Sequence, residues 1–230
     1  LKLLQKTTLS DYDGTASFEN FDELLKKYIA DIKNQVEAIF ETSVLSIFKD
    51  DKFNFKPDNP CSVISLFEQS CIEKGLSYKE GGTVYTVVSP HIGGLPDAVN
   101  SLYAIKKAVF DDKIISFGEF MKTLENNWDG SEDLRKYILN NYTYFGNDND
   151  EVDEIAAKIL NDFSDACMEY DSKTPVRFVS GVSTFGRQLE WASARSAAPF
   201  GRKKGDVLSG NLSPTPGTDH SGAAAIIKSY

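Results

Sequence analysis

Residues 83–109 read TVYTVVSPHIGGLPDAVNSLYAIKKAV and place a strand pattern directly before a helix pattern. The first part, Thr83–Val88, is β-branched and aromatic and predicts a strand. Ser89–Gly94 predicts a loop, and apolar residues at helical spacing predict a helix over about 97–109. A strand followed by a helix indicates an α/β fold.

Helical patterns continue on both sides of this stretch. Helices are expected over about 18–48, 61–74, 116–127, 131–140 and 151–170. Ser17 is a candidate N-cap, Ser116 with Glu119 fits a capping box, and Gly75 is suited to end a helix.

A second strand is expected over Arg177–Thr184, and Asp50–Asn59 is expected to form a loop. From Gly186 onward the chain is rich in Gly, Ser, Pro and Ala and shows weak periodicity. Two strands are too few to close a sheet. We therefore expect further strands from the tail or from chain outside these residues.

The composition excludes several classes of protein. Apolar residues make up 41% and charged residues 26% of 230 residues, which is typical of a soluble globular protein. The net charge of −9 argues against a nucleic-acid surface, which is basic. The sequence contains no apolar run of about 18 residues and no signal-peptide pattern. We expect neither a nucleic-acid nor a membrane partner.

The cysteines and histidines provide few candidates for a metal site or a catalytic triad. Cys61, Cys71 and Cys167 are odd in number and lack C-x-x-C spacing, which indicates a reducing, cytoplasmic location. His91 and His220 are the only histidines and lie far apart in the sequence. We therefore predict no metal site.

Three local motifs each allow two interpretations. Asn147–Asp153 could bind calcium, but it lacks the Gly and Glu of an EF-hand loop and otherwise predicts an acidic helix N-terminus. Gly201–Gly205 could hold an anion or form a solvated basic turn. Ser213–His220 contains two prolines and Gly217, so it predicts a rigid loop that is either a pocket rim or a connector.

Taken in order, several stretches resemble the pyruvate formate-lyase-like glycyl radical enzymes over about residues 20–230. These stretches are Ser70–Gly75, Gly81–Tyr85, Ser101–Lys113, Glu125–Gly130, Phe145–Glu154, Gly201–Gly205, Leu212–Asp219 and Ala225–Ser229. Pro199-Phe-Gly-Arg202 departs from the family's usual Pro-Asp-Gly-Arg, and Ser89–Gly94 departs from its Gly-Pro-Gln pattern.

The resemblance implies a ten-stranded α/β barrel with outer helices, of which residues 1–230 would be a single, incomplete part. It also implies a relay in which a glycyl radical generates a thiyl radical at a cysteine, which attacks the substrate. A radical S-adenosylmethionine activating enzyme would install the radical in the parent protein. The parent is expected to be homo-oligomeric and to act on a small-molecule substrate.

The family's radical-bearing Arg-Val-x-Gly motif is absent from these 230 residues. Cys71 is followed by Glu73 at the spacing of the family's catalytic loop, but its context resembles an outer helix. We therefore expect no catalytic residue and no bound cofactor in this chain, which alone is expected to be inactive.

The Ser213–Gly217 stretch resembles the family's loop near the substrate pocket, in the form of the diol-dehydratase and lyase branch. Ser213, Pro214, Thr215 and Gly217 are thus the expected substrate-binding residues. The implied parent is a lyase or dehydratase that cleaves a C–O, C–N, C–S or C–C bond. Formate C-acetyltransferase is an alternative within the family, and a non-catalytic relative or structural subunit is an alternative outside catalysis.

Overall fold

The structure, a computed structural model, describes residues 2–5, 18–55, 61–183 and 186–230. The chain forms two compact units. The first is drawn from Leu1–Ile32, His91–Asp162 and Val182–Tyr230, and the second from Lys33–Pro90 and Phe163–Gly181. A single domain over residues 1–230 stays a prediction.

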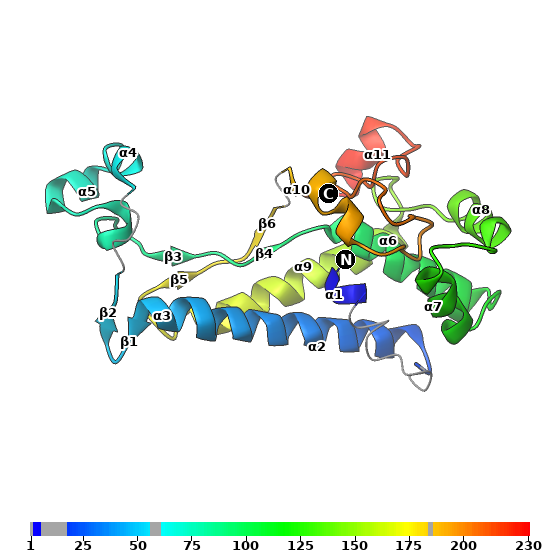
Figure 1. Ribbon diagram of the computed structural model, residues 1–230, viewed down its shortest axis with the longest axis horizontal. Coiled ribbons are helices and arrows are strands. Elements are labelled where there is room, and N and C mark those ends of the chain that lie inside the picture. The colour runs from blue at the N-terminus through cyan, green and yellow to red at the C-terminus, as the bar shows by residue number, and fades with distance from the viewer. Residues whose placement is uncertain (1, 6–17, 56–60, 184–185) are drawn as a thin grey trace. The chain divides into compact units, whose positions relative to one another are not determined.

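Helices make up most of the described structure (Figure 1). The α-helices are α1 (Lys2–Gln5), α2 (Phe21–Ile39), α3 (Leu45–Ile47), α4 (Ser62–Ser65), α5 (Gln69–Lys74), α6 (Leu95–Ile105), α7 (Phe117–Glu125), α8 (Glu132–Asn141), α9 (Asp150–Asp171), α10 (Arg187–Glu190) and α11 (Ala223–Lys228). Two π-helical segments cover Phe40–Val44 and Lys106–Asp111, and two 3-10 turns cover Tyr78–Glu80 and Ala192–Ala194. Within the described ranges, no helix is long and apolar enough to cross a membrane.

The strands are short and form three pairs. They are β1 (Phe48–Lys49), β2 (Lys52–Phe53), β3 (Val87–Val88), β4 (His91–Ile92), β5 (Arg177–Phe178) and β6 (Gly181–Val182). β1 pairs with β2 antiparallel, β3 with β5 parallel, and β4 with β6. The described residues are therefore a mostly helical α/β segment, and they do not themselves form a barrel.

Helix α6 belongs to the first unit and is buried along its whole length. All eleven of its residues are buried, including Asp97, Asn100 and Ser101. Because a helix that is buried on every side must be surrounded by other elements, its polar side chains need partners within the protein. Those partners come from the C-terminal part of the chain and form the candidate site.

The core of the second unit contains an aromatic cluster. The ring of Phe40, at the start of the first π segment, lies 4.8 Å from that of Tyr170 on α9 and 5.5 Å from that of Phe178 on β5. Phe178 is fully buried, and its parallel pairing with Val88 fixes the register of the two strands. The first π segment, the C-terminal end of α9 and the β3–β5 strand pair therefore share one hydrophobic core.

The strand predictions are only partly right. The strand expected over Thr83–Val88 is limited to Val87–Val88, because pairing begins where the Arg177 N–H donates to the Thr86 carbonyl (2.8 Å). The expected loop Ser89–Gly94 contains β4. The strand expected over Arg177–Thr184 is divided into β5 and β6, and Thr184 lies outside the described residues.

Most of the helix predictions are confirmed, with two local corrections. The helix expected over 61–74 is broken into α4 and α5, because Glu68 adopts an extended backbone (φ −105°, ψ 106°). The expected loop Asp50–Asn59 begins with the turn and second strand of the β1–β2 hairpin. Gly75 ends α5 in the left-handed conformation, as expected. Ser17 lies outside the described residues.

Candidate functional site

The candidate site is the Ser209–Ser221 loop of the first unit, and Asp97 in the first turn of α6 anchors it. One oxygen of the Asp97 carboxylate accepts a hydrogen bond from the Thr215 hydroxyl (2.6 Å), and the other accepts one from the Ser209 N–H (2.9 Å). Asp97, Ser209 and Thr215 are all buried. Hydrogen bonds to an ionised carboxylate are among the stronger ones in proteins, so this side chain fixes the loop on the helix.

Asn100, one turn further along α6, makes the second contact to the loop. Its amide nitrogen donates to the Thr215 hydroxyl oxygen (3.2 Å), and its amide oxygen accepts from the Phe145 N–H (3.0 Å). The Thr215 hydroxyl therefore both donates and accepts within the chain. Residues separated by three positions share one face of a helix, which explains why Asp97 and Asn100 reach the same threonine.

Asn147 holds the second half of the loop. Its amide nitrogen donates to the Thr218 carbonyl (2.7 Å), and its amide oxygen accepts from the N–H groups of His220 (2.7 Å) and Ser221 (3.0 Å). Asn147 is buried, so these bonds satisfy a polar side chain that has little access to water. The loop is thus fixed at both ends.

The four predicted site residues divide into two kinds. Thr215 is buried, and the half-buried Pro214 packs so tightly on Gly146 that a Cβ there would lie 2.4 Å from the Pro214 Cγ. Ser213 and Gly217 are exposed, and Gly217 has a φ of +82° with open space around its Cα. The first two residues can support a binding surface, and the last two can touch a ligand.

Arg202 shapes the segment that precedes the loop. Its guanidinium is buried and donates to the carbonyls of Ala192 (3.0 Å), Ser196 (2.8 Å) and Asp206 (2.6 Å). Burial lowers the pKa of Arg202, and the nearby charges of Asp97 and Asp206 act in the opposite direction. This arginine belongs to the Pro199–Arg202 motif, and its role here is to organise backbone.

The two alternatives for the basic turn and the acidic motif can be compared with the structure. Lys203 forms an ion pair with Glu132, as expected of a basic turn at the protein surface. Asp150, Glu151 and Asp153 lie in the first turn of α9, which confirms an acidic helix N-terminus. No group of three potential metal ligands occurs among the described side chains.

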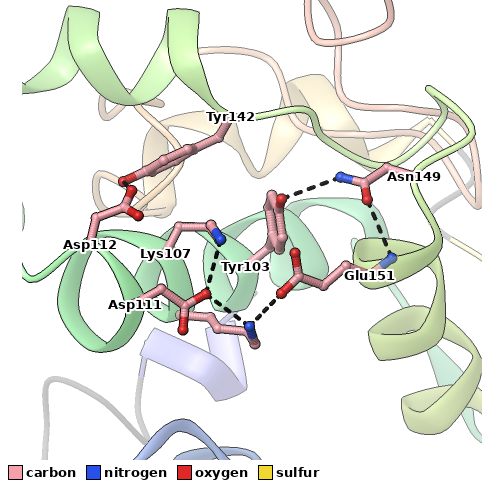
Figure 2. Close-up of polar contacts among 8 residues, drawn as sticks. Tyr103, Lys107, Asp111, Asp112, Tyr142, Asn149 and Glu151 are labelled. Atoms are coloured by element: carbon pink, nitrogen blue, oxygen red, sulfur yellow. Dashed lines mark hydrogen bonds and ion pairs between the residues drawn. The ribbon is translucent and has the colours of Figure 1, made fainter.

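A second polar cluster joins the π segment Lys106–Asp111, which follows α6, to the start of α9 (Figure 2). Lys106 forms ion pairs with Asp111 (2.9 Å) and with Glu151, and Lys107 pairs with Asp111 (3.0 Å). Burial lowers the pKa of Lys106, but its bonds to Glu151 and Asp111 outweigh this effect and raise the pKa overall. Burial alone would raise the pKa of Asp111, but the hydrogen bonds and charges of Lys106 and Lys107 outweigh this effect and lower the pKa overall.

Three tyrosines, Tyr103, Tyr137 and Tyr142, help to line an open cavity of about 820 Å³ at this cluster. Tyr103 and Tyr142 also bond to neighbouring polar side chains. The Tyr142 hydroxyl donates to Asp112 (2.9 Å), and the Asn149 amide donates to the Tyr103 hydroxyl (3.3 Å), as Figure 2 shows. Burial raises the pKa of Tyr103 and of Tyr142, and the Asp112 carboxylate raises that of Tyr142 further. Both hydroxyls therefore stay protonated, and their bonds join neighbouring elements.

Sequence reasoning missed Asp97, Asn100 and Asn147, the three residues that hold the loop. A signal was present in the helix pattern, because Asp97 and Asn100 interrupt an otherwise apolar segment at a spacing of three. Polar side chains on a buried helix face require partners. That signal does not identify the partner, Thr215, which lies 115 residues after Asn100 and 118 residues after Asp97.

Comparison with known proteins gives one family match. The model of the family described as "Pyruvate formate lyase-like" matches residues 3–191. The chain is 30% identical over 225 residues to the probable dehydratase YbiW of Escherichia coli (strain K12), covering 94% of this chain and 27% of that protein. It is 29% identical over 216 residues to trans-4-hydroxy-L-proline dehydratase of Clostridioides difficile, covering 93% and 26%.

Among solved structures, the B12-independent glycerol dehydratase from Clostridium butyricum, in its glycerol-bound form, matches with a TM-score of 0.79. The sequence identity is 28%, and the match covers 99% of this chain and 30% of that chain. The chain thus spans less than a third of the length of the proteins it matches.

Proposed function

Because the chain belongs to the pyruvate formate lyase-like glycyl radical enzymes, in their dehydratase and lyase branch, we propose that the full-length protein is a glycyl radical dehydratase or lyase. It cleaves a C–O, C–N, C–S or C–C bond of a small polar substrate by a Gly-to-Cys radical relay. The observation that carries this proposal is the similarity to dehydratases along nearly the whole chain. Formate C-acetyltransferase and a non-catalytic relative are the alternatives.

The radical chemistry itself is not assigned to these residues. The 230 residues contain no Arg-Val-x-Gly motif, and Cys71 is buried within the short helix α5. In the full-length protein the glycyl radical supplies one-electron chemistry, and a radical S-adenosylmethionine enzyme is the partner that installs it. A homo-oligomeric, cytoplasmic enzyme belongs to the same proposal, as does a barrel completed by the remaining chain.

The contribution of this chain is the Ser213–Gly217 wall of the substrate cavity. Thr215 and Pro214 fix the backbone, through the bonds to Asp97 and Asn100 and the contact with Gly146. The exposed Ser213 offers a hydroxyl that can bond an oxygen-bearing substrate. The open space around Gly217 lets a ligand approach the backbone closely.

A substrate screen tests the proposal. The full-length protein would be activated anaerobically by a radical S-adenosylmethionine enzyme and offered glycerol, propane-1,2-diol and trans-4-hydroxy-L-proline. Loss of water from a vicinal diol yields an aldehyde, which a coupled alcohol dehydrogenase detects. Turnover of any of these substrates supports a dehydratase. An activated protein that instead exchanges formate with pyruvate would favour the alternative within the family.

Replacing Gly217 with valine is expected to lower kcat/KM of the full-length protein on the order of 10-fold to 100-fold. Gly217 has a φ of +82°, a region that β-branched residues avoid, so valine distorts the loop. Gly205→Val is the matched control, because Gly205 has a φ of +94°, open surroundings and a place outside the loop. Steady-state kinetics of the two variants check the prediction. Equal kcat/KM values for the two variants would show that the Ser209–Ser221 loop is not part of the substrate site.

A further inference from the structure

The Asp97 carboxylate is buried in a way that needs explanation. It is fully buried, and it forms no ion pair with the described lysines and arginines. Burying a charge is unfavourable unless hydrogen bonds and dipoles compensate for the lost hydration. The compensation comes from the Ser209 N–H, the Thr215 hydroxyl, the N-terminus of α6, where Asp97 is the third residue, and the charge of the nearby buried Arg202 guanidinium.

The two bonds of Asp97 lie on either side of the exposed Ser213. Because one carboxylate holds both Ser209 and Thr215, a single rigid side chain sets the path of the backbone between them. Asn100 adds a second bond to Thr215 and connects it to the Phe145 N–H. A connector that only joins two elements does not require a buried charge at this position.

Ser209 provides an independent indication. Its hydroxyl oxygen is fully buried and has no hydrogen-bond partner among the described residues. An unsatisfied buried hydroxyl destabilises a protein, and such groups occur where function constrains the structure. The hydrogen bond that the Ser209 N–H donates to Asp97 holds this unfavourable arrangement in place.

We propose that Asp97 is a positioning residue of the substrate site: acting through Thr215, it holds Ser213 and Gly217 in the geometry that turnover requires. This inference rests on the proposed function, because it assigns a role within the same site. Asp97 itself touches no substrate. The loss of its charge shifts the loop and leaves the fold of the buried helix in place.

The test uses the full-length protein with Asp97→Asn, and with Asp129→Asn as the matched control at an exposed position. We expect Asp97→Asn to lower kcat/KM roughly 10-fold or more, while Asp129→Asn leaves it unchanged. Thr215→Val removes the hydroxyl at constant shape and is expected to give the same loss. Thr215→Ser keeps the hydroxyl and is expected to restore most of the activity.

The double variant shows whether Asp97 acts through Thr215. If it does, Asp97→Asn combined with Thr215→Val is no worse than the poorer single variant, because both remove the same interaction. If the losses of kcat/KM of the two single variants multiply in the double variant, the inference is overturned. An Asp97→Asn protein that melts at a lower temperature but retains the kcat and KM of the wild type would also overturn it, since that is a structural role only.

Amide hydrogen exchange separates failure of this inference from failure of the proposed function. In Asp97→Asn, the backbone N–H groups of the non-proline residues within 209–217 are expected to exchange at least 10-fold faster than in the control, because their anchor is weakened. A wild type without turnover would reject the proposed function, and the exchange rates would still decide whether Asp97 anchors the loop. Unchanged exchange in this segment overturns the inference whatever the activity.

Discussion

Replacing Trp128 with alanine is expected to lower the free energy of unfolding of the 230-residue chain by about 3–5 kcal/mol. The Trp128 side chain is fully buried, its ring packs edge-on against Phe120 (5.8 Å between centroids), and its indole N–H donates to the Arg202 carbonyl (3.2 Å). Alanine would leave a cavity, and the Arg202 carbonyl would keep only the hydrogen bond that it accepts from the Ala198 N–H (2.9 Å). Denaturant unfolding followed by circular dichroism measures the change.

The other tryptophan of the chain is the control. Trp191 is 36% exposed and lies below the guanidinium groups of Arg187 and Arg195, at 5.8 and 5.4 Å from the ring centroid. Exposed cation–π contacts contribute about 0.5–1 kcal/mol, so Trp191→Ala is expected to have a small effect. Equal losses for the two variants would contradict the assignment of Trp128 to the core of the first unit.

Gly146→Ala is expected to lower the free energy of unfolding by about 2–5 kcal/mol. Gly146 has a φ of +93°, and an added Cβ would lie 2.4 Å from the Pro214 Cγ. The proline ring is rigid, so the contact cannot be relieved by a rotation of the side chain. The strain of the left-handed backbone and the overpacking therefore add together, and the same denaturation experiment measures their sum.

A matched glycine separates the two contributions. Gly130 also has a positive φ, +75°, but an added Cβ there would meet no atom within 4 Å. Gly130→Ala is thus expected to carry the backbone strain alone, about 1–2 kcal/mol. Combining Gly146→Ala with Pro214→Ala should destabilise the protein by less than the sum of the single changes. Full additivity would show that the two residues do not touch.

Local signals in the sequence predicted local structure well. The capping box of Ser116 and Glu119 is formed at the start of α7, and Gly75 is left-handed at the end of α5. These features depend on residues within one turn of each other, so the sequence contains all that determines them. The amphipathic patterns of α2 and α9 are of the same kind, since each describes a single helix face.

The β1–β2 hairpin was missed although its signal was present. Phe48 and Phe53 flank the two-residue turn Asp50-Asp51, and both aspartates have positive φ, 52° and 57°. Two-residue hairpin turns favour such conformations, and aspartate adopts them more readily than most residues. The facing phenylalanine rings lie 5.0 Å apart and stabilise the pair. The polar composition of 50–59 concealed this pattern.

For the candidate site, the sequence predicted only that the loop is rigid. Two prolines and a glycine indicate a fixed loop, and the structure shows that Pro214 and Thr215 are packed and hydrogen-bonded. Asp97 and Asn100 reach the loop only when the chain folds. A repeating pattern within a short stretch of sequence cannot show which distant residues will meet. Whether Ser213 and Gly217 touch a substrate stays a prediction.

Electron paramagnetic resonance tests the central claim most directly, namely that this chain is a segment of a glycyl radical enzyme and does not carry the radical itself. The full-length protein and the 230-residue chain would each be treated anaerobically with a radical S-adenosylmethionine activating enzyme and a reductant. We expect a glycine-type doublet from the full-length protein and no organic radical from the chain. A doublet from the 230-residue chain, or none from the full-length protein, would contradict the claim.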